Sequence, residues 1–265
     1  MNLNLTIAHL YPKHLNLYGD IGNIICLERR CEWHGIDFQI NNLGLEDKIE
    51  PSKTDIYFIG GGQDNDQILI VDDFHKTKYK TIQEDIENNT VLLGVCGGYQ
   101  LIGHSFLMGD GKNTKGLGII DIETKAPGKE VKNRCIGNLI AELDHDIYNE
   151  IKKIYTKDIK ILHTLVGFEN HWGQTYFTSD KVKPLANTIK GFGNNYSAKY
   201  EGARYRNVFG SYMHGSFLPK NPHFADYLIW LALVRKYNDR SIKLEPLDNK
   251  EEIQAHKYIL DRYVK

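Results

Sequence analysis

One cysteine of the chain lies in a turn that suits a reactive thiol. Residues 94–100 read GVCGGYQ, with Cys96 third, and they join the apolar run 91–95 to an expected helix. The G-x-C-x-G spacing is typical of a nucleophile elbow, where only small neighbours permit the strained backbone. The free N–H groups at the start of the next helix favour the thiolate form. The pattern therefore predicts that Cys96 is an exposed nucleophile and not a small buried residue.

The other three cysteines lack glycines on both sides, and we expect them to be structural. Cys26 and Cys31 lie in an expected helix, and Cys135 lies in a strand-like stretch. No pair has C-x-x-C spacing, and 4 cysteines are too few for a disulfide framework in a chain of 265 residues. All of them are therefore expected to be reduced thiols.

A thiol that attacks an amide needs a base to take its proton. His214 is the candidate, because it follows an expected strand over 207–213 and precedes Gly215, at the strand end where open α/β sheets place their sites. The chain has 11 histidines, so position and not residue type singles out His214.

The attack also needs donors for the developing oxyanion. Gly60, Gly61 and Gly62 end an expected strand, and glycines can turn backbone N–H groups towards a substrate where a Cβ would block its approach. Gly97, directly after the cysteine, supplies a further N–H group. A tight turn without a chemical role is the alternative for the three consecutive glycines.

The order of the expected elements indicates an α/β fold. A strand, a crossover helix and a second strand imply parallel pairing, and the apolar run 91–95 fits a central strand covered on both faces. We expect an open, mostly parallel, flavodoxin-like sheet flanked by helices, with a short antiparallel extension beyond residue 106. The expected strands are 3–9, 36–40, 55–59, 91–95 and 207–213, the helices 20–35, 72–88, 225–237 and 249–263, and the extension segments 117–122 and 159–168.

The glycine run after a strand, the G-x-C-x-G-x-Q segment and the late strand ending in His, in this order, resemble the class I glutamine amidotransferase domain over residues 3–220. Residues 221–265 are then expected to form a C-terminal helical extension packed on the same domain. The nearest resemblance is to the cobyric acid synthase-like branch. Within it, the segments LNLYGDIGN at 15–23, VGFENH at 166–171 and YMHG at 212–215 are similar to the glutaminase subunits of lipid II isoglutaminyl synthase.

The resemblance implies that Cys96 attacks glutamine and forms a thioester, with His214 as its base. It implies that Arg134 binds the carboxylate of glutamine, because a guanidinium can donate two parallel hydrogen bonds to a carboxylate. Judged from its residue type alone, Arg134 is an ordinary surface cation. Further substrate contacts are expected from Gly61, Gly62, Gly97 and Gln100.

The third catalytic residue departs from the commonest class I pattern. In that pattern a Glu two positions after the His orients the imidazole, but this chain has Ser216 there. Glu169 and Asp20 are the candidates for the missing carboxylate, and we favour Glu169 because it lies in a loop flanked by glycine. Either carboxylate could instead cap a helix or pair with a surface cation.

Composition limits the cofactors and partners. The 33 Lys and Arg nearly balance 34 Asp and Glu, so nothing suggests binding to nucleic acid or a membrane surface. No run of 18 apolar residues and no signal peptide is visible, so we expect a cytoplasmic protein. The sequence has no phosphate-binding G-x-x-x-x-G-K-[ST] motif and no paired metal-ligand spacing. We expect no cofactor in this chain, with ATP and Mg²⁺ on a separate synthetase.

The resemblance implies that this partner is a Mur ligase-like (MurT-type) enzyme that uses the ammonia to amidate the D-glutamate of lipid II in peptidoglycan synthesis. Two alternatives stay open at the level of sequence. The same glutaminase chemistry could serve another carboxylate acceptor, such as a corrinoid, or the chain could be a non-catalytic regulatory relative. A cysteine peptidase on a similar sheet fits less well, because a Gln follows the elbow and the His lies far downstream.

Overall fold

A computed structural model describes residues 2–62, 64–107, 113–127, 134–214 and 216–264. A six-stranded sheet forms its centre, with the order β13-β14-β4-β3-β1-β2. All neighbouring pairs are parallel except β13 with β14. The bounds are β1 Asn4–Leu10, β2 Asp37–Leu43, β3 Ile56–Ile59, β4 Val91–Val95, β13 Ala203–Tyr205 and β14 Val208–Ser211. The expected open, mostly parallel sheet is therefore confirmed.

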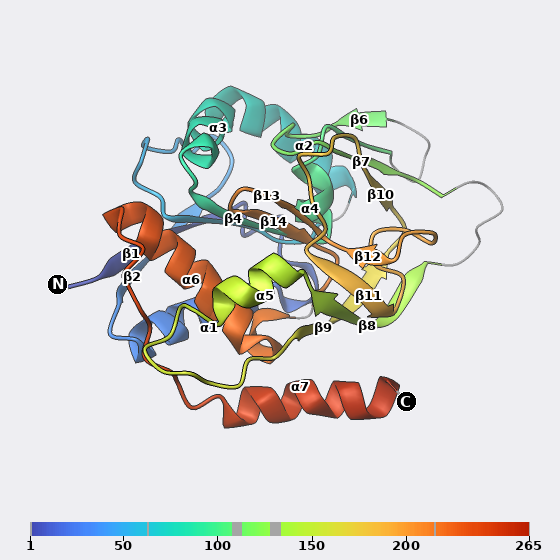
Figure 1. Cartoon of the computed structure of the whole chain (residues 1–265). Helices are drawn as coiled ribbons and strands as arrows, with labels where there is room; N and C mark the ends of the chain where they lie inside the picture. Colours follow the sequence, from blue (N-terminus) through green and yellow to red (C-terminus); the bar gives the residue numbers. More distant parts are fainter. Residues whose placement is uncertain (1, 63, 108–112, 128–133, 215, 265) are drawn as a thin grey trace.

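Helices cover both faces of this sheet (Figure 1). Side chains from α1 and α6 pack in one apolar core, and side chains from α2, α3 and α4 pack in the other. Successive residues of β4 alternate between these cores, since Val91 and Leu93 join the first and Leu92 joins the second. The helices are α1 Ile21–Trp33, α2 Asp64–Thr77, α3 Tyr79–Glu87, α4 Gly97–Leu101, α5 His145–Ile151, α6 Pro222–Tyr237 and α7 Lys250–Tyr263. A wholly apolar β4 is what a strand covered on both faces requires.

The antiparallel part is larger than the short extension expected from the sequence. It comprises two four-stranded sheets, β10-β7-β5-β6 and β12-β11-β8-β9, beside the carboxyl end of the central sheet (Figure 1), and every strand pair in them is antiparallel except β5 with β7. Their short strands carry little periodic signal, which is why the sequence understated them. The bounds are β5 Ser105–Leu107, β6 Asn113–Lys115, β7 Ile122–Lys125, β8 Cys135–Leu143, β9 Thr164–His171, β10 Gln174–Phe177, β11 Ala186–Lys190 and β12 Tyr200–Glu201.

Three expected elements have different limits in the structure. The single helix expected over 72–88 is two helices, α2 and α3, which meet at Lys78. The Lys78 ammonium turns inward and donates to Asp73 Oδ2 at 2.8 Å. The polar start of α2 concealed its first turns in the sequence. The segments expected as strands over 117–122 and 159–168 contribute only the beginnings of β7 and β9.

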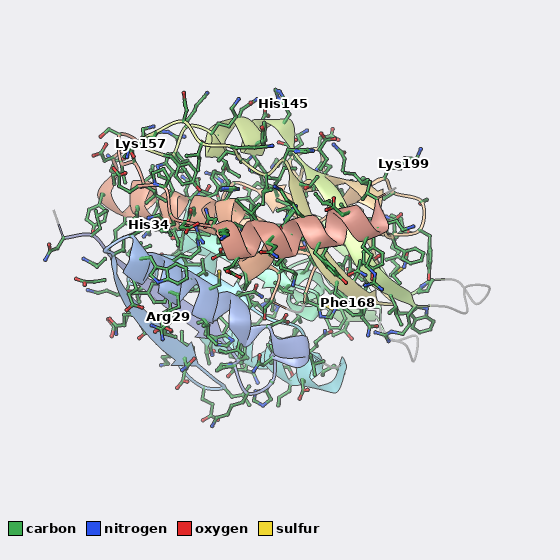
Figure 2. All side chains as sticks on the ribbon, turned by 90° about the horizontal axis from the view of Figure 1, so that it is seen from below. Arg29, His34, His145, Lys157, Phe168 and Lys199 are labelled. Atoms are coloured by element: carbon green, nitrogen blue, oxygen red, sulfur yellow. The ribbon has the colours of Figure 1, made fainter. Side chains whose placement is uncertain are left out.

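The C-terminal part packs on the central domain through two different helices. Residues 222–233 of α6 are all buried, so α6 belongs to the core. Helix α7 is mostly exposed and crosses the lower face of the molecule (Figure 2). Its buried His256 lies 2.7 Å from the Lys220 carbonyl oxygen and 2.8 Å from Thr164 Oγ1. A domain boundary at residue 220 stays a prediction. Within the described ranges, no helix has the length and apolar character to cross a membrane.

Candidate active site

Cys96 occupies a strained turn between β4 and α4. Its backbone has φ +50° and ψ −106°, a conformation that is costly for a residue with a side chain. The flanking glycines permit the turn, because a Cβ on Gly98 would overlap the Ile59 carbonyl oxygen and lie 2.8 Å from that of Gly60. The expected elbow is therefore present at the carboxyl end of the sheet, but the Cys96 side chain is partly buried against both apolar cores and not exposed as expected.

His214 is brought to the same end of the sheet by β14. Strands β14 and β4 are parallel neighbours, with Ser211 aligned to Val95. The Cys96 N–H donates to the Ser211 carbonyl oxygen at 2.8 Å, and the His214 N–H donates to the Phe168 carbonyl oxygen of β9 at 2.9 Å. The His214 side chain is buried. The expectation that Cys96 and His214 each follow a strand at this end of the sheet agrees with the structure, which shows in addition that the two strands are neighbours.

Burial sets the charge states of both groups. It raises the pKa of the Cys96 thiol to about 12, against smaller lowering effects from the Gly97 N–H and Arg134. It also lowers the pKa of His214 to about 4, and the charges of His171 and Arg134 act in the same direction. Both groups are therefore neutral near pH 7 without substrate. The neutral thiol differs from the thiolate expected from the sequence. Helix α4 has only 5 residues, so the partial positive charge at its N-terminus lowers the thiol pKa less than burial raises it.

The glycine turn after β3 lies against the nucleophile. A Cβ on Gly97 would be 2.9 Å from the Gly62 nitrogen, so these two backbone N–H groups are close neighbours. A Cβ on Gly61 would be 3.4 Å from Cys96 Cβ. The Gly61 N–H, however, donates to Asp20 Oδ2 at 2.7 Å. Gly62 and Gly97 are thus better placed than Gly61 as donors to a substrate oxygen.

Arg134 stands at the start of β8 and is held by the neighbouring strand β9. Its Nε donates to Asn170 Oδ1 at 3.0 Å, and its Nη2 donates to the Asn170 carbonyl oxygen at 3.3 Å. The side chain is exposed, yet its charge lowers the pKa of both Cys96 and His214. Arg134 therefore presents a cation beside the two candidate catalytic groups.

Glu169 is buried in strand β9, and not in the expected loop, next to a second histidine. Its carboxylate accepts from the backbone N–H groups of Phe192 at 2.8 Å and Gly193 at 3.1 Å, and it lies 3.4 Å from His171 Nε2. The His171 ring stacks on Tyr212 with 3.6 Å between ring centroids. Since His171 in turn influences the pKa of His214, an effect of Glu169 on His214 would pass through His171.

Several polar residues at the site were not singled out in the sequence. Gln67 of α2 is buried, and its Nε2 is 3.4 Å from the Gly62 carbonyl oxygen. Glu201 is buried under β14 and accepts from Ser211 Oγ at 2.7 Å, and burial raises its pKa to about 7. Gln100, expected to contact substrate, donates to the Tyr212 hydroxyl at 3.3 Å. Only contacts between distant segments reveal the placements of Gln67 and Glu201, so no local motif could have found these two residues.

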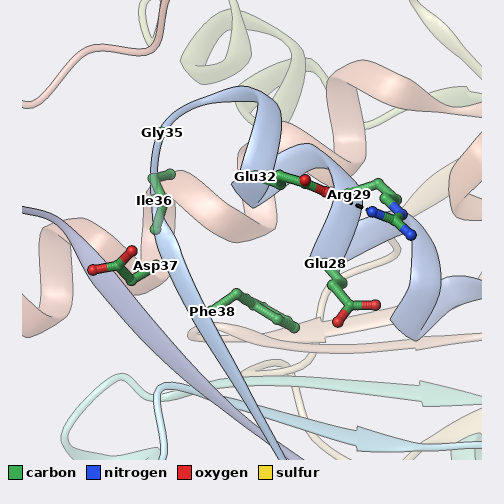
Figure 3. Close-up of a pocket in the computed structure, with 7 residues that line it drawn as sticks. All are labelled: Glu28, Arg29, Glu32, Gly35, Ile36, Asp37 and Phe38. Atoms are coloured by element: carbon green, nitrogen blue, oxygen red, sulfur yellow. Dashed lines mark hydrogen bonds and ion pairs between the residues drawn. The ribbon is translucent and has the colours of Figure 1, made fainter.

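One hollow of the surface lies away from these residues. It is formed by the second half of α1 and the start of β2, and an Arg29–Glu32 ion pair of 2.7 Å lies along its α1 side (Figure 3). Its lining residues are Glu28, Arg29, Glu32, Gly35, Ile36, Asp37 and Phe38. None of them is a candidate catalytic residue, so the chemistry is assigned to the sheet end and not to this hollow.

Comparison with known proteins agrees with the geometry of the sheet end. Residues 6–222 match the CobB/CobQ-like glutamine amidotransferase domain. The chain belongs to this family. The match covers Cys96, His214 and the glycine turn, and it confirms the family predicted from the sequence.

Two relatives in this family match nearly the whole chain. The chain is 38% identical to the lipid II isoglutaminyl synthase (glutamine-hydrolyzing) subunit GatD of Staphylococcus aureus, over 97% of this chain and 96% of that protein. It is 40% identical to the GatD subunit of Streptococcus pneumoniae, over 88% of this chain and 82% of that protein. A probable cobyric acid synthase of Methanococcus maripaludis is 32% identical over 59% of this chain and 29% of that protein.

Two solved structures share the fold. The glutaminase domain of Trypanosoma brucei CTPS, with bound acivicin, superposes with a TM-score of 0.54 and covers 92% of this chain and 98% of that one, at 17% identity. PurLQS of Thermotoga maritima superposes with a TM-score of 0.51 and covers 90% of this chain and 100% of that one, at 15% identity. At such low identity these structures support the architecture of the family and nothing finer.

Proposed function

We propose that the protein is the glutamine-hydrolysing subunit of a two-component amidotransferase of the lipid II isoglutaminyl synthase type. One observation carries the proposal. The strained Cys96 turn is joined to the strand that leads to His214 in a chain that is 38% identical to GatD of Staphylococcus aureus over 97% of its length. A non-catalytic relative would have no use for such a costly turn around a thiol.

The proposed reaction begins when Cys96 Sγ attacks the side-chain amide carbon of glutamine. His214 takes the thiol proton during the attack: its low pKa keeps the imidazole neutral and able to accept, and the high pKa of the thiol requires the proton to leave as the new S–C bond forms. The N–H groups of Gly62 and Gly97 stabilise the oxyanion. His214 then returns the proton to the nitrogen, ammonia leaves, and a thioester on Cys96 stays behind. Water activated by His214 hydrolyses the thioester and releases glutamate.

Two further residues act outside the bond-breaking step. Arg134 binds the α-carboxylate of glutamine, and Asn170 fixes the direction of its guanidinium. Glu169 holds His171, which lies close enough to His214 to influence its pKa, and so helps to orient the base. Substrate contacts by Gly61 and Gln100 stay predictions, since their polar groups are engaged with Asp20 and Tyr212.

The ammonia would be consumed by a Mur ligase-like partner that carries ATP and Mg²⁺ and amidates the D-glutamate of lipid II in the cytoplasm. The names of the two relatives that match most of the chain support this acceptor. The partial similarity to cobyric acid synthase supports a corrinoid carboxylate as a second candidate. Both candidates require the same glutaminase chemistry.

The test is to measure glutamate release from glutamine by the purified subunit, alone and with the Mur ligase-like partner, ATP and either acceptor. We expect release to rise with the partner, and mass spectrometry to detect an amide on lipid II. Amidation of a corrinoid and not of lipid II would show that the acceptor is a corrinoid carboxylate. Absence of glutamate in every mixture would refute the glutaminase itself.

A further inference from the structure

Asp20 is a buried carboxyl beside the nucleophile that the proposed reaction does not yet use. It precedes α1 and is 0% exposed. One oxygen, Oδ2, accepts the Gly61 N–H at 2.7 Å. A Cβ added to Gly61 would lie 3.2 Å from Asp20 Oδ2 and 3.4 Å from Cys96 Cβ. The carboxyl and the cysteine therefore approach the same point beside Gly61.

The second oxygen of Asp20 is unsatisfied. Oδ1 is buried and has no hydrogen-bond partner among the residues that the structure describes. A buried carboxyl with one unused oxygen is unfavourable unless a ligand completes its bonding. Burial raises the pKa of Asp20 to about 7, against the lowering effect of the Gly61 N–H. Above pH 7 the carboxyl is mainly ionised, and its unpaired Oδ1 is then a hydrogen-bond acceptor beside the nucleophile.

Asp20 also lies next to the segment that follows His214. The Ser216 hydroxyl donates to the Gly19 carbonyl oxygen at 2.8 Å, and a Cβ on Gly22 would overlap that hydroxyl. The carboxyl thus sits between the glycine turn and the chain that carries the base. The leaving nitrogen of glutamine must reach His214, so it comes to this side of the site.

We propose that Asp20 Oδ1 accepts an N–H from the side-chain amide of glutamine and so selects glutamine over glutamate. This inference rests on the proposed glutaminase function. A carboxamide nitrogen offers two N–H donors, whereas the side-chain carboxylate of glutamate offers only acceptors and a negative charge. Ionised Asp20 therefore attracts the substrate and repels the product. The proton that the leaving nitrogen gains still comes from His214, and Asp20 keeps its protonation state throughout.

Asp20→Asn tests the idea sharply because it keeps the size of the side chain. Gly61 needs an acceptor, so the Asn oxygen takes the place of Oδ2 and the Asn NH₂ group replaces Oδ1. The group that faces the substrate then changes from acceptor to donor. It should oppose the NH₂ of glutamine and favour the carboxylate of glutamate.

The experiment compares glutamine with L-glutamate γ-methyl ester at pH 8, using the subunit with its synthetase partner. The ester has no N–H on its leaving group, so the loss of an Asp20 contact should not affect it. For Asp20→Asn we expect kcat/KM to fall roughly 10- to 100-fold with glutamine and less than about threefold with the ester. Equal losses with both substrates would overturn the proposal, because they would mean that Asp20 only positions Gly61. Unchanged turnover of both would overturn it as well.

A matched control and a binding measurement separate this proposal from the proposed function. Asp85→Asn alters another buried carboxyl, which accepts from the Tyr57 hydroxyl at 2.7 Å, and it should leave the amide-to-ester ratio unchanged. In Cys96→Ala protein, calorimetry should show that adding Asp20→Asn tightens glutamate binding and weakens glutamine binding, by roughly fivefold or more each. Unaltered glutamate and glutamine affinities would contradict the role of Asp20. A wild-type protein that hydrolyses neither glutamine nor ester would instead refute the glutaminase assignment.

Discussion

The backbone N–H of Cys96 donates a 2.8 Å hydrogen bond to the carbonyl oxygen of Ser211. This bond ties the strained turn of the nucleophile to the last residue of β14, and His214 follows on the same chain. The proposed nucleophile and the proposed base are therefore fixed by sheet pairing. Such rigid placement is what a site for covalent catalysis requires.

Gly98→Ala should disrupt the turn of the nucleophile. The added Cβ would overlap the Ile59 carbonyl oxygen and approach that of Gly60 to 2.8 Å, and both are backbone atoms that cannot turn aside. We expect a loss of about 1–3 kcal/mol in the free energy of unfolding, together with a large fall in glutaminase activity. Urea denaturation measures the first effect. Gly44→Ala is the control, because its Cβ would lie 3.6 Å from Asp47 Oδ2, and it should cost well under about 1 kcal/mol.

Arg134→Ala should raise KM for glutamine with little change in kcat. The guanidinium is expected to contact the α-carboxylate in the ground state and the transition state alike. A loss of roughly 30- to 1,000-fold in kcat/KM is expected, and Arg134→Lys should recover only part of it. Arg29→Ala, which removes an exposed Arg–Glu pair on α1, should have no effect. A kcat/KM for Arg134→Ala within about threefold of wild type would make Arg134 a plain surface cation.

Asp20→Asn should stabilise the fold more at high pH than at low pH. The pKa of Asp20 rises from 3.8 to about 7 on folding, so its contribution to stability is present below pH 3.8 and is lost as the pH rises through about 7. The Asn variant has no such loss. Between pH 5 and pH 8 its stability relative to wild type should therefore increase by about 2 kcal/mol. Thermal unfolding at the two pH values measures this difference, and a pH-independent difference would contradict a buried ionisable Asp20.

Alkylation of Cys96 by iodoacetamide should keep accelerating as the pH rises above 9. Burial holds the thiol protonated, with a pKa of about 12, in the substrate-free subunit. Glutamine should protect Cys96 and leave the labelling of the other cysteines unaffected. Peptide mapping by mass spectrometry follows each site. A labelling rate that reaches its plateau below pH 8 would show that the free subunit already holds a thiolate.

The sequence predicted those parts of the site that depend on local pattern and strand order. The glycine spacing around Cys96 and the position of His214 after a late strand were enough to place both residues at one sheet end. The fold class followed from the same order of elements.

The rest of the site depends on contacts that no local pattern encodes. Arg134 reaches the site because β8 pairs with β9, and Glu169 meets His171 through the same strand. The contact of Asp20 with Gly61 joins residues 41 positions apart. The protonated state of the thiol follows from burial, which the sequence does not display. Short strands likewise hid the extent of the two four-stranded sheets, and a polar helix start hid the beginning of α2.

The most direct test of the account is glutamate release by Cys96→Ala in complex with the synthetase partner. Loss of the nucleophile should lower the rate with glutamine by roughly 10⁴-fold or more. The same complex should still amidate the acceptor when an ammonium salt replaces glutamine, which shows that the variant is folded and docked. Glutamate release at a rate near wild type would contradict the assignment of Cys96 and, with it, the proposed function.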